Sequence, residues 1–289
     1  MKNSIVILMV GLIVLLSTIS QTHADPQGTL TPRAYLPIVI APECASSSAN
    51  EYTSGIAYQF DTDNPVRPAY DHADKNIELR GYVANTDPDL KGELVDYGSG
   101  DPTQPPQLAT LFSPAQVPTF VDFYQVHNWN WVPSPTPGTR STPIDDPPVT
   151  AVSFSLPQST ALHTPISGYD IGGGVEAIVI FADKDTVTLH YTREDSAAKG
   201  YTVHIDHICT DPNLLSLYNS LDDADGPRYD YPSASYNLPT LAAGQALGTT
   251  SSQDMVVAIV DTGAFQDPRS CNEWWQIRPD YGGTCPPGP

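Results

Sequence analysis

Basic side chains are scarce in this 289-residue sequence. Thirteen lysines and arginines stand against 33 aspartates and glutamates, a formal net charge of −20 at pH 7. A surface of that sign repels phosphate backbones, so the composition excludes nucleic acid as a partner. Acidic loops of this kind suit Ca²⁺ instead.

Long hydrophobic runs are also scarce: residues 5–19 form the one such run in the sequence. This run follows Lys2, precedes Ala24, and is shorter than the roughly 20 residues of a membrane span. The order is typical of a secretory signal peptide. We predict a signal peptide over 1–24, a spacer containing YLPIVI over 25–43, and a secreted or cell-envelope protein without a membrane span in the mature chain. A retained N-terminal anchor is the alternative.

Cysteine is limited to four residues, and no CxxC motif occurs, which argues against a zinc–thiolate site. An even number of cysteines in an exported chain predicts two disulfides, with three pairings possible. We expect the pairs Cys44–Cys209 and Cys271–Cys285.

Proline and glycine are abundant, with 29 and 20 residues, and this favours turns and short strands. We predict an all-β fold over 44–289, a β-sandwich or barrel-like sheet with two short capping helices. Asp211-Pro212 and Asp267-Pro268 are expected to start the helices. The Pro-, Ser- and Thr-rich stretch 133–148 is a candidate internal boundary. The expected strands are 55–60, 78–84, 123–132, 149–156, 175–182, 186–192, 201–208 and 255–261.

Two tryptophans, Trp129 and Trp131, share one face of the expected strand 123–132. Such a pair can stack on a sugar or a peptide, although burial in a sandwich core is the more frequent arrangement. We take both as candidate binding residues.

Histidines cluster in the stretch His204-Ile205-Asp206-His207. Strand alternation puts His204 and Asp206 on one face and His207 on the other, so the two histidines cannot grip one ion. His190 is expected on the neighbouring strand. Zinc needs three or four converging ligands, and only one or two are offered here. We commit to no cofactor, with Zn²⁺ and Ca²⁺ as alternatives; the weak candidate ligands are His72, His204 and Asp206.

A motif resemblance covers residues 200–261. The matching residues are Gly200, Tyr201, Val203, Ile205, Asp206, His207, Leu217, Tyr218, Leu241, Gly244, Gln245 and Gly248. This segment resembles the core of LytM/lysostaphin-type (M23) metallopeptidases, and the resemblance places His207 on a histidine that assists catalysis. The chain departs from the family where H-x-H is expected, since it has DMVVAIV there. At the expected H-x-x-x-D it offers only His72 with Asn76.

Arg193 belongs to a second similarity. With Glu194, Asp195 and the corner 267–270, it resembles a module of uncharacterised exported bacterial proteins. We count His190, His204, Asp206 and Arg193 as binding candidates beside the two tryptophans.

These observations favour a secreted, non-catalytic binding or envelope-associated module with a cell-wall or extracellular glycan or peptide as ligand. No catalytic residue is assigned, and His207 is the candidate. A zinc-dependent peptidoglycan endopeptidase is the first alternative, and a structural or adhesive protein is the second. A serine hydrolase is disfavoured because no G-x-S-x-G turn occurs.

Overall fold

The computed structural model describes residues 44–59, 68–90, 92–97, 105–133, 136–224 and 235–277. All of them belong to one compact unit, Ala41–Pro289. The expected signal peptide (1–24) and spacer (25–43) lie outside the described residues. Within the described ranges, no helix has the length and apolar character that crossing a membrane requires.

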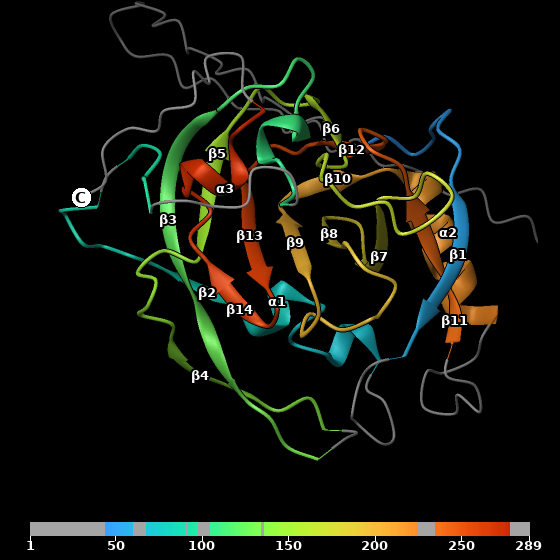
Figure 1. Ribbon diagram of the computed structural model, residues 1–289, viewed down its shortest axis with the longest axis horizontal. Helices are drawn as coiled ribbons and strands as arrows, with labels where there is room; N and C mark the ends of the chain where they lie inside the picture. The colour runs from blue at the N-terminus through green and yellow to red at the C-terminus, as the bar shows by residue number, and fades with distance from the viewer. Residues whose placement is uncertain are drawn as a thin grey trace, which may run out of the picture. The chain divides into compact units, whose positions relative to one another are not determined.

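A large antiparallel sheet of eleven described strands forms the centre of this unit (Figure 1). Its spatial order is β1 (Thr53–Tyr58), β11 (Ser235–Leu241), β7 (Ala177–Ala182), β8 (Thr186–His190), β9 (Tyr201–Asp206), β13 (Met255–Asp261), β5 (Ala151–Ser155), β3 (Thr119–Asn130) and β2 (Tyr82–Ala84). Two more strands attach from the side: β14 (Ala264–Gln266) pairs with β13, and β4 (Thr139–Pro143) pairs with β3.

A second, smaller antiparallel sheet contains β10 (Ile208–Thr210), β12 (Ala246–Thr250) and β6 (Ala161–His163). The described helical elements are short: η1 (Ala69–Asp71), α1 (Ile77–Arg80), η2 (Leu108–Leu111), α2 (Pro212–Ala224) and α3 (Cys271–Trp274). The prediction of an all-β fold with short helices is confirmed.

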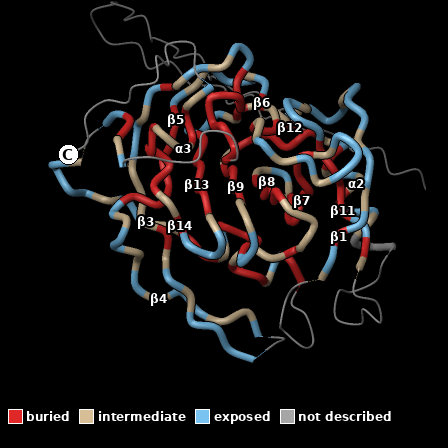
Figure 2. The backbone as a smooth tube through the Cα atoms, viewed as in Figure 1, coloured by how far each residue is buried: buried red, intermediate tan, exposed pale blue. Residues whose placement is uncertain are grey.

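The central strands are buried on both faces, as Figure 2 shows for β7, β8, β9 and β13. One face of β9 places Val203 and Ile205 in the main hydrophobic core. On the opposite face, Val256 and Ala258 of β13 contribute to a smaller apolar cluster. A sheet of this kind needs a covering layer on each side, because no face can remain in water with its apolar residues exposed.

Residues 78–84 do not form the continuous strand that was expected. Residues 77–80 form α1 instead, because the Asn76 side chain accepts hydrogen bonds from the backbone N–H groups of Glu78 and Leu79. Gly81, with φ of 72°, ends the helix, and only the last three residues pair as β2.

The two expected helices differ in outcome. Asp211 caps α2 as predicted, since its carboxylate accepts from the N–H groups of Asn213 and Leu214. The second helix, α3, begins at Cys271 with Ser270 as N-cap, so Asp267 is not its cap. The Asp267 carboxylate instead accepts from the backbone N–H and the guanidinium of Arg269, before the helix begins, with 2.7 Å between Nη2 and Oδ2.

The Cys44–Cys209 disulfide is confirmed, and it ties the start of the described chain to β10. Cys271 is also disulfide-bonded, while its expected partner Cys285 lies outside the described residues. The stretch 133–148 joins β3 to β5, two strands that pair in the same sheet.

One buried ion pair attaches the segment Pro68–Ala84, called the covering segment below, to the sheet. Lys75 Nζ lies 2.9 Å from Asp195 Oδ2, and both side chains are 1% exposed. The Tyr236 hydroxyl donates to the same carboxylate oxygen, and the Thr188 hydroxyl donates to the Lys75 carbonyl. The pair therefore joins three separate stretches of chain at one point.

The substitution K75M should lower the free energy of unfolding by about 3–5 kcal/mol, because it removes the Lys75 ammonium from the buried Asp195 carboxylate. Denaturant unfolding measures this. The matched control is K184M, since the Lys184 side chain is 83% exposed and its ion pair with Asp185 contributes little. Equal losses in the two variants would contradict the role assigned to Lys75.

Candidate functional site

Three neighbouring strands, β8, β9 and β13, form the face of the sheet that carries the histidines. His190 lies on β8, which pairs with β9 as predicted. In register, His204 of β9 lies between Thr188 of β8 and Ala258 of β13. Asp206 of β9 lies between Thr186 and Val256 in the same way. On the β13 side, the neighbours of His204 and Asp206 are therefore an alanine and a valine.

Both central histidines are buried and held neutral. His204 Nδ1 lies 3.1 Å from the Thr188 hydroxyl, and burial lowers the pKa of His204 to about 3. Burial also lowers the pKa of His190 to about 4, while its two ring nitrogens each lie 2.8 Å from a threonine hydroxyl, those of Thr202 and Thr192. Charged imidazole is disfavoured here because the surroundings are dry.

The covering segment closes this face. Ile77 of α1 packs in the apolar cluster that contains Val256, Ala258 and Phe265. The Phe265 ring stacks on His204, with 6.0 Å between ring centroids, and the Arg80 guanidinium lies over the same Phe265 ring. His190, His204 and Asp206 are each at most 1% exposed as a result.

Asp206 accepts three hydrogen bonds. Its carboxylate accepts from the Tyr82 hydroxyl, the Thr186 hydroxyl and the backbone N–H of His207, each at 2.8 Å. The same carboxylate and burial raise the pKa of Tyr82, burial being the larger cause. A carboxylate with three donors in this position stabilises the junction of β2, β8 and β9.

His207 does not lie on the opposite face from Asp206, and that expectation is wrong. The strand β9 ends at Asp206, and His207 adopts φ of 60° in the left-handed region. This turn brings His207 Nε2 to 3.9 Å from Asp206 Oδ2 and 3.5 Å from the Tyr82 hydroxyl. Strand alternation failed because β9 stops at Asp206, two residues before the expected end of the strand at Ile208.

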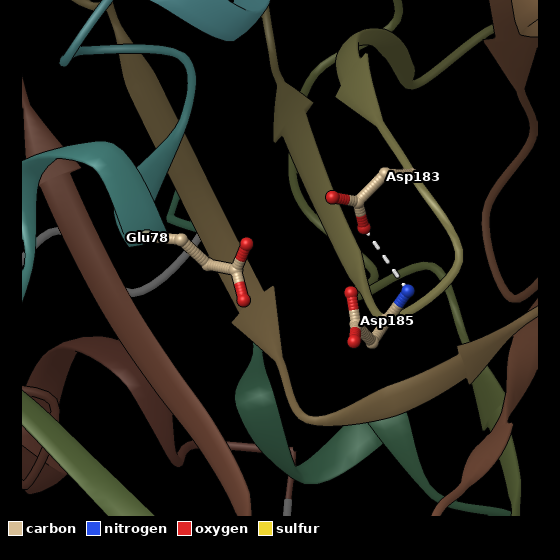
Figure 3. A group of neighbouring side chains, drawn as sticks. All are labelled: Glu78, Asp183 and Asp185. Atoms are coloured by element: carbon tan, nitrogen blue, oxygen red, sulfur yellow. Dashed lines mark hydrogen bonds between the residues drawn. The ribbon is translucent and has the colours of Figure 1, made fainter.

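Three carboxylates gather next to this corner, as Figure 3 shows. Glu78 comes from α1, and Asp183 and Asp185 come from the turn between β7 and β8; one oxygen of each lies within 4.8 Å of the others. Carboxylate oxygens are the ligands that hard divalent cations prefer. These are the described residues that could hold such a cation, and exposed acidic groups of this kind are common without one.

The acidic cluster has perturbed protonation. Partial burial raises the pKa of Glu78, and the charges of Asp206, Asp185 and Asp183 add to that effect. Burial raises the pKa of Asp183 as well; the backbone N–H of Asp185 lowers it, while the side chain and charge of Asp185 raise it. Sequence reasoning missed the cluster because Glu78 meets the turn only through the folded covering segment.

The remaining candidates are not members of this cluster, although the charge of Asp206 acts on Glu78. Among the described residues, no group of three close metal-ligand side chains includes His72, His204 or Asp206. The Arg193 guanidinium donates to the backbone carbonyls of Ile171, Ile56 and Gly172, so it ties loops to β1.

The two tryptophans lie where β3 leaves the sheet. Beyond Val126, β3 pairs only with β4, and these residues extend as a two-stranded ribbon, visible at the lower left of Figure 1. Trp131 is 43% exposed, and its ring contacts Trp129 at 6.3 Å and His72 at 5.1 Å between centroids. Trp129 is half-buried, and its Nε1 donates to Pro137 O. We call Trp129, Trp131, His72 and Val132 the aromatic ribbon.

Comparisons with known proteins give no relative. No protein-family model matches the chain, and neither the curated proteins nor the solved structures contain a match.

Removing one charge from the acidic cluster should stabilise the protein at neutral pH. A carboxyl group whose folded pKa lies above its unfolded value loses stability as pH rises from about 4 through the folded pKa. The substitution D185N removes a charge that raises the pKa values of Glu78 and Asp183, so this loss should shrink. The free energy of unfolding should rise by less than about 1 kcal/mol, since the groups are partly exposed.

Denaturant unfolding at pH 7 and at pH 4 measures the difference, which should be larger at pH 7. The control E93Q removes an exposed carboxylate outside the cluster and should change neither value. A D185N protein less stable than the wild type at pH 7 would contradict the repulsion described here.

Proposed function

We propose that this chain is a secreted, non-catalytic binding module of the cell envelope, built on an M23-like core without the full zinc ligand set. The neighbouring strand β13 carries the observation on which the proposal rests. Next to Asp206 and His204 it presents Val256 and Ala258, where the family resemblance calls for H-x-H. Without those imidazoles, a zinc ion would lack the ligands that activate its water.

Closure of the histidine face supports the same conclusion. A hydrolytic site needs room for a substrate beside its catalytic groups. Here the covering segment packs Ile77 onto the face, and His190 and His204 are buried beneath it. Binding is therefore assigned to a surface elsewhere on the molecule.

The disulfide supports export. Cys44 and Cys209 are joined, and such bonds persist mainly in oxidising compartments. The predicted signal peptide and the acidic composition agree with the same location.

The aromatic ribbon is the surface best suited to a glycan or peptide of the envelope. Trp131 presents a large ring to solvent, and this ring contacts the rings of Trp129 and His72. Such a ring offers contact area at low entropic cost, because its neighbours already restrict its rotamers. A Cβ at Gly138, whose φ is 102°, would collide with the Trp129 ring. The glycine therefore allows the backbone to approach this ring closely.

The test is co-sedimentation of the full chain with insoluble peptidoglycan. W131A should weaken binding about tenfold or more, since truncating a tryptophan anchor costs about 2 kcal/mol. The control V121A trims another exposed side chain of β3 outside the ribbon and should bind like the wild type. Equal binding by W131A and the wild type would contradict the assignment.

Zinc content and hydrolysis separate the alternative. Protein folded with equimolar zinc and then dialysed should retain less than one equivalent and release no peptidoglycan fragments. One equivalent of bound zinc together with fragment release would make the chain an endopeptidase.

A further inference from the structure

An open groove lies on a different part of the molecule from the aromatic ribbon, between residues 50–52 and helix α2. Its volume is about 520 Å³, within the roughly 300–1,000 Å³ typical of small-molecule sites. In Figure 1 the helix is at the right, while the ribbon formed by β3 and β4 is at the lower left. None of the residues that line the groove belongs to the histidine face or to the acidic cluster.

One wall is a single face of α2. Asn213, Ser216, Leu217 and Ser220 line it, at the i, i+3, i+4 and i+7 spacing that aligns side chains along a helix. The opposite face of the helix is anchored in the core through Leu214 and other buried residues. The groove wall is therefore held by core packing.

The other wall is fixed from behind by hydrogen bonds. Asn50 Nδ2 donates to Asp211 Oδ2 at 2.7 Å, Gln245 Nε2 donates to the Glu51 carbonyl at 3.0 Å, and the Tyr52 hydroxyl donates to the Ala246 carbonyl at 3.1 Å. These bonds leave the wall with little freedom to lose when a ligand binds, which favours affinity.

A bridge of two hydrogen bonds sets the spacing of the walls. Asn213 Nδ2 donates to the carbonyls of Ser48 and Asn50, at 3.1 and 2.8 Å. Both amide hydrogens are thereby used, and the Asn213 side chain can offer a ligand only its oxygen. Ser220 donates to the Leu217 carbonyl at 2.8 Å, so its hydroxyl is likewise left as an acceptor.

The groove therefore offers mainly acceptors, and it excludes anions. Within the described part of the chain, the Glu51 carboxylate has no hydrogen-bond or ion-pair partner. The first N–H groups of α2 are already taken, since Asn213 and Leu214 donate to Asp211. An anion would meet the Glu51 carboxylate in the groove, with the Asp211 carboxylate behind Asn50, and neither of these two N–H groups would be free to bind it, which is unfavourable.

We propose that this groove binds a neutral saccharide of one or two pyranose rings. A pyranose carries hydroxyl donors around its edge, and these match acceptors distributed along both walls. Its C–H face matches the apolar surface that Tyr52 and Leu217 add to the same walls. A primary amine, in contrast, has all its donors on one nitrogen. It would bind the Glu51 carboxylate and leave the other acceptors of the groove unused.

The test is a titration of the isotope-labelled full chain, followed by NMR, with chitobiose and cellobiose as neutral probes and putrescine as the cationic probe. The wild type should show saturable shifts at groove residues with at least one disaccharide. S216W places an indole in the groove and should weaken that binding at least tenfold.

N219W is the matched control, because Asn219 is exposed on the same helix and does not line the groove. It should bind like the wild type, which shows that an added indole on α2 does no general harm. Three results would overturn the proposal: no saturable shift with either disaccharide, equal binding by S216W, or saturation by putrescine alone. W131A should leave these shifts unchanged, so failure here and failure of the ribbon are separate results.

Discussion

The covering segment and the sheet face beneath it depend on each other. A row of threonines, histidines and an aspartate on central strands is costly to bury unless its polar atoms find hydrogen-bond partners, and among the described residues His204 Nε2 has none. Lys75 and Ile77 hold the covering segment over this face, one through its ion pair with Asp195 and the other through apolar packing. The same segment forms the acidic cluster, since α1 brings Glu78 to the turn at Asp183.

Burial also changes what the histidines can do. A neutral imidazole with a pKa of about 3 or 4 binds protons too weakly for acid–base work near neutral pH. Nδ1 of His204 and both ring nitrogens of His190 instead lie within hydrogen-bond distance of the Thr188, Thr202 and Thr192 hydroxyls. The same residue types that suggest a metal site in the sequence are therefore part of the packed sheet, and the proposed binding function is assigned to surfaces that remain open.

Local chemistry explains how far the sequence could be interpreted. The all-β class, the pairing of His190's strand with β9 and the Asp211 cap of α2 follow from composition, periodicity and capping. The cysteine count predicts disulfides but leaves three pairings open, and the expected Cys44–Cys209 bond is one choice among them. Residues 78–84 misled because the Asn76 cap outweighed a strand-like pattern. The acidic cluster and the α2 groove join residues more than a hundred positions apart, which no local signal reports.

The central claim is that the histidine face is closed and dry, and ring-nitrogen NMR of the imidazoles tests it most directly. Between pH 7 and about 5, His190 and His204 should stay neutral, and one equivalent of Zn²⁺ should leave their ring nitrogens unshifted. Titration near the ordinary value of 6.5, or a shift of both rings on adding zinc, would contradict the account.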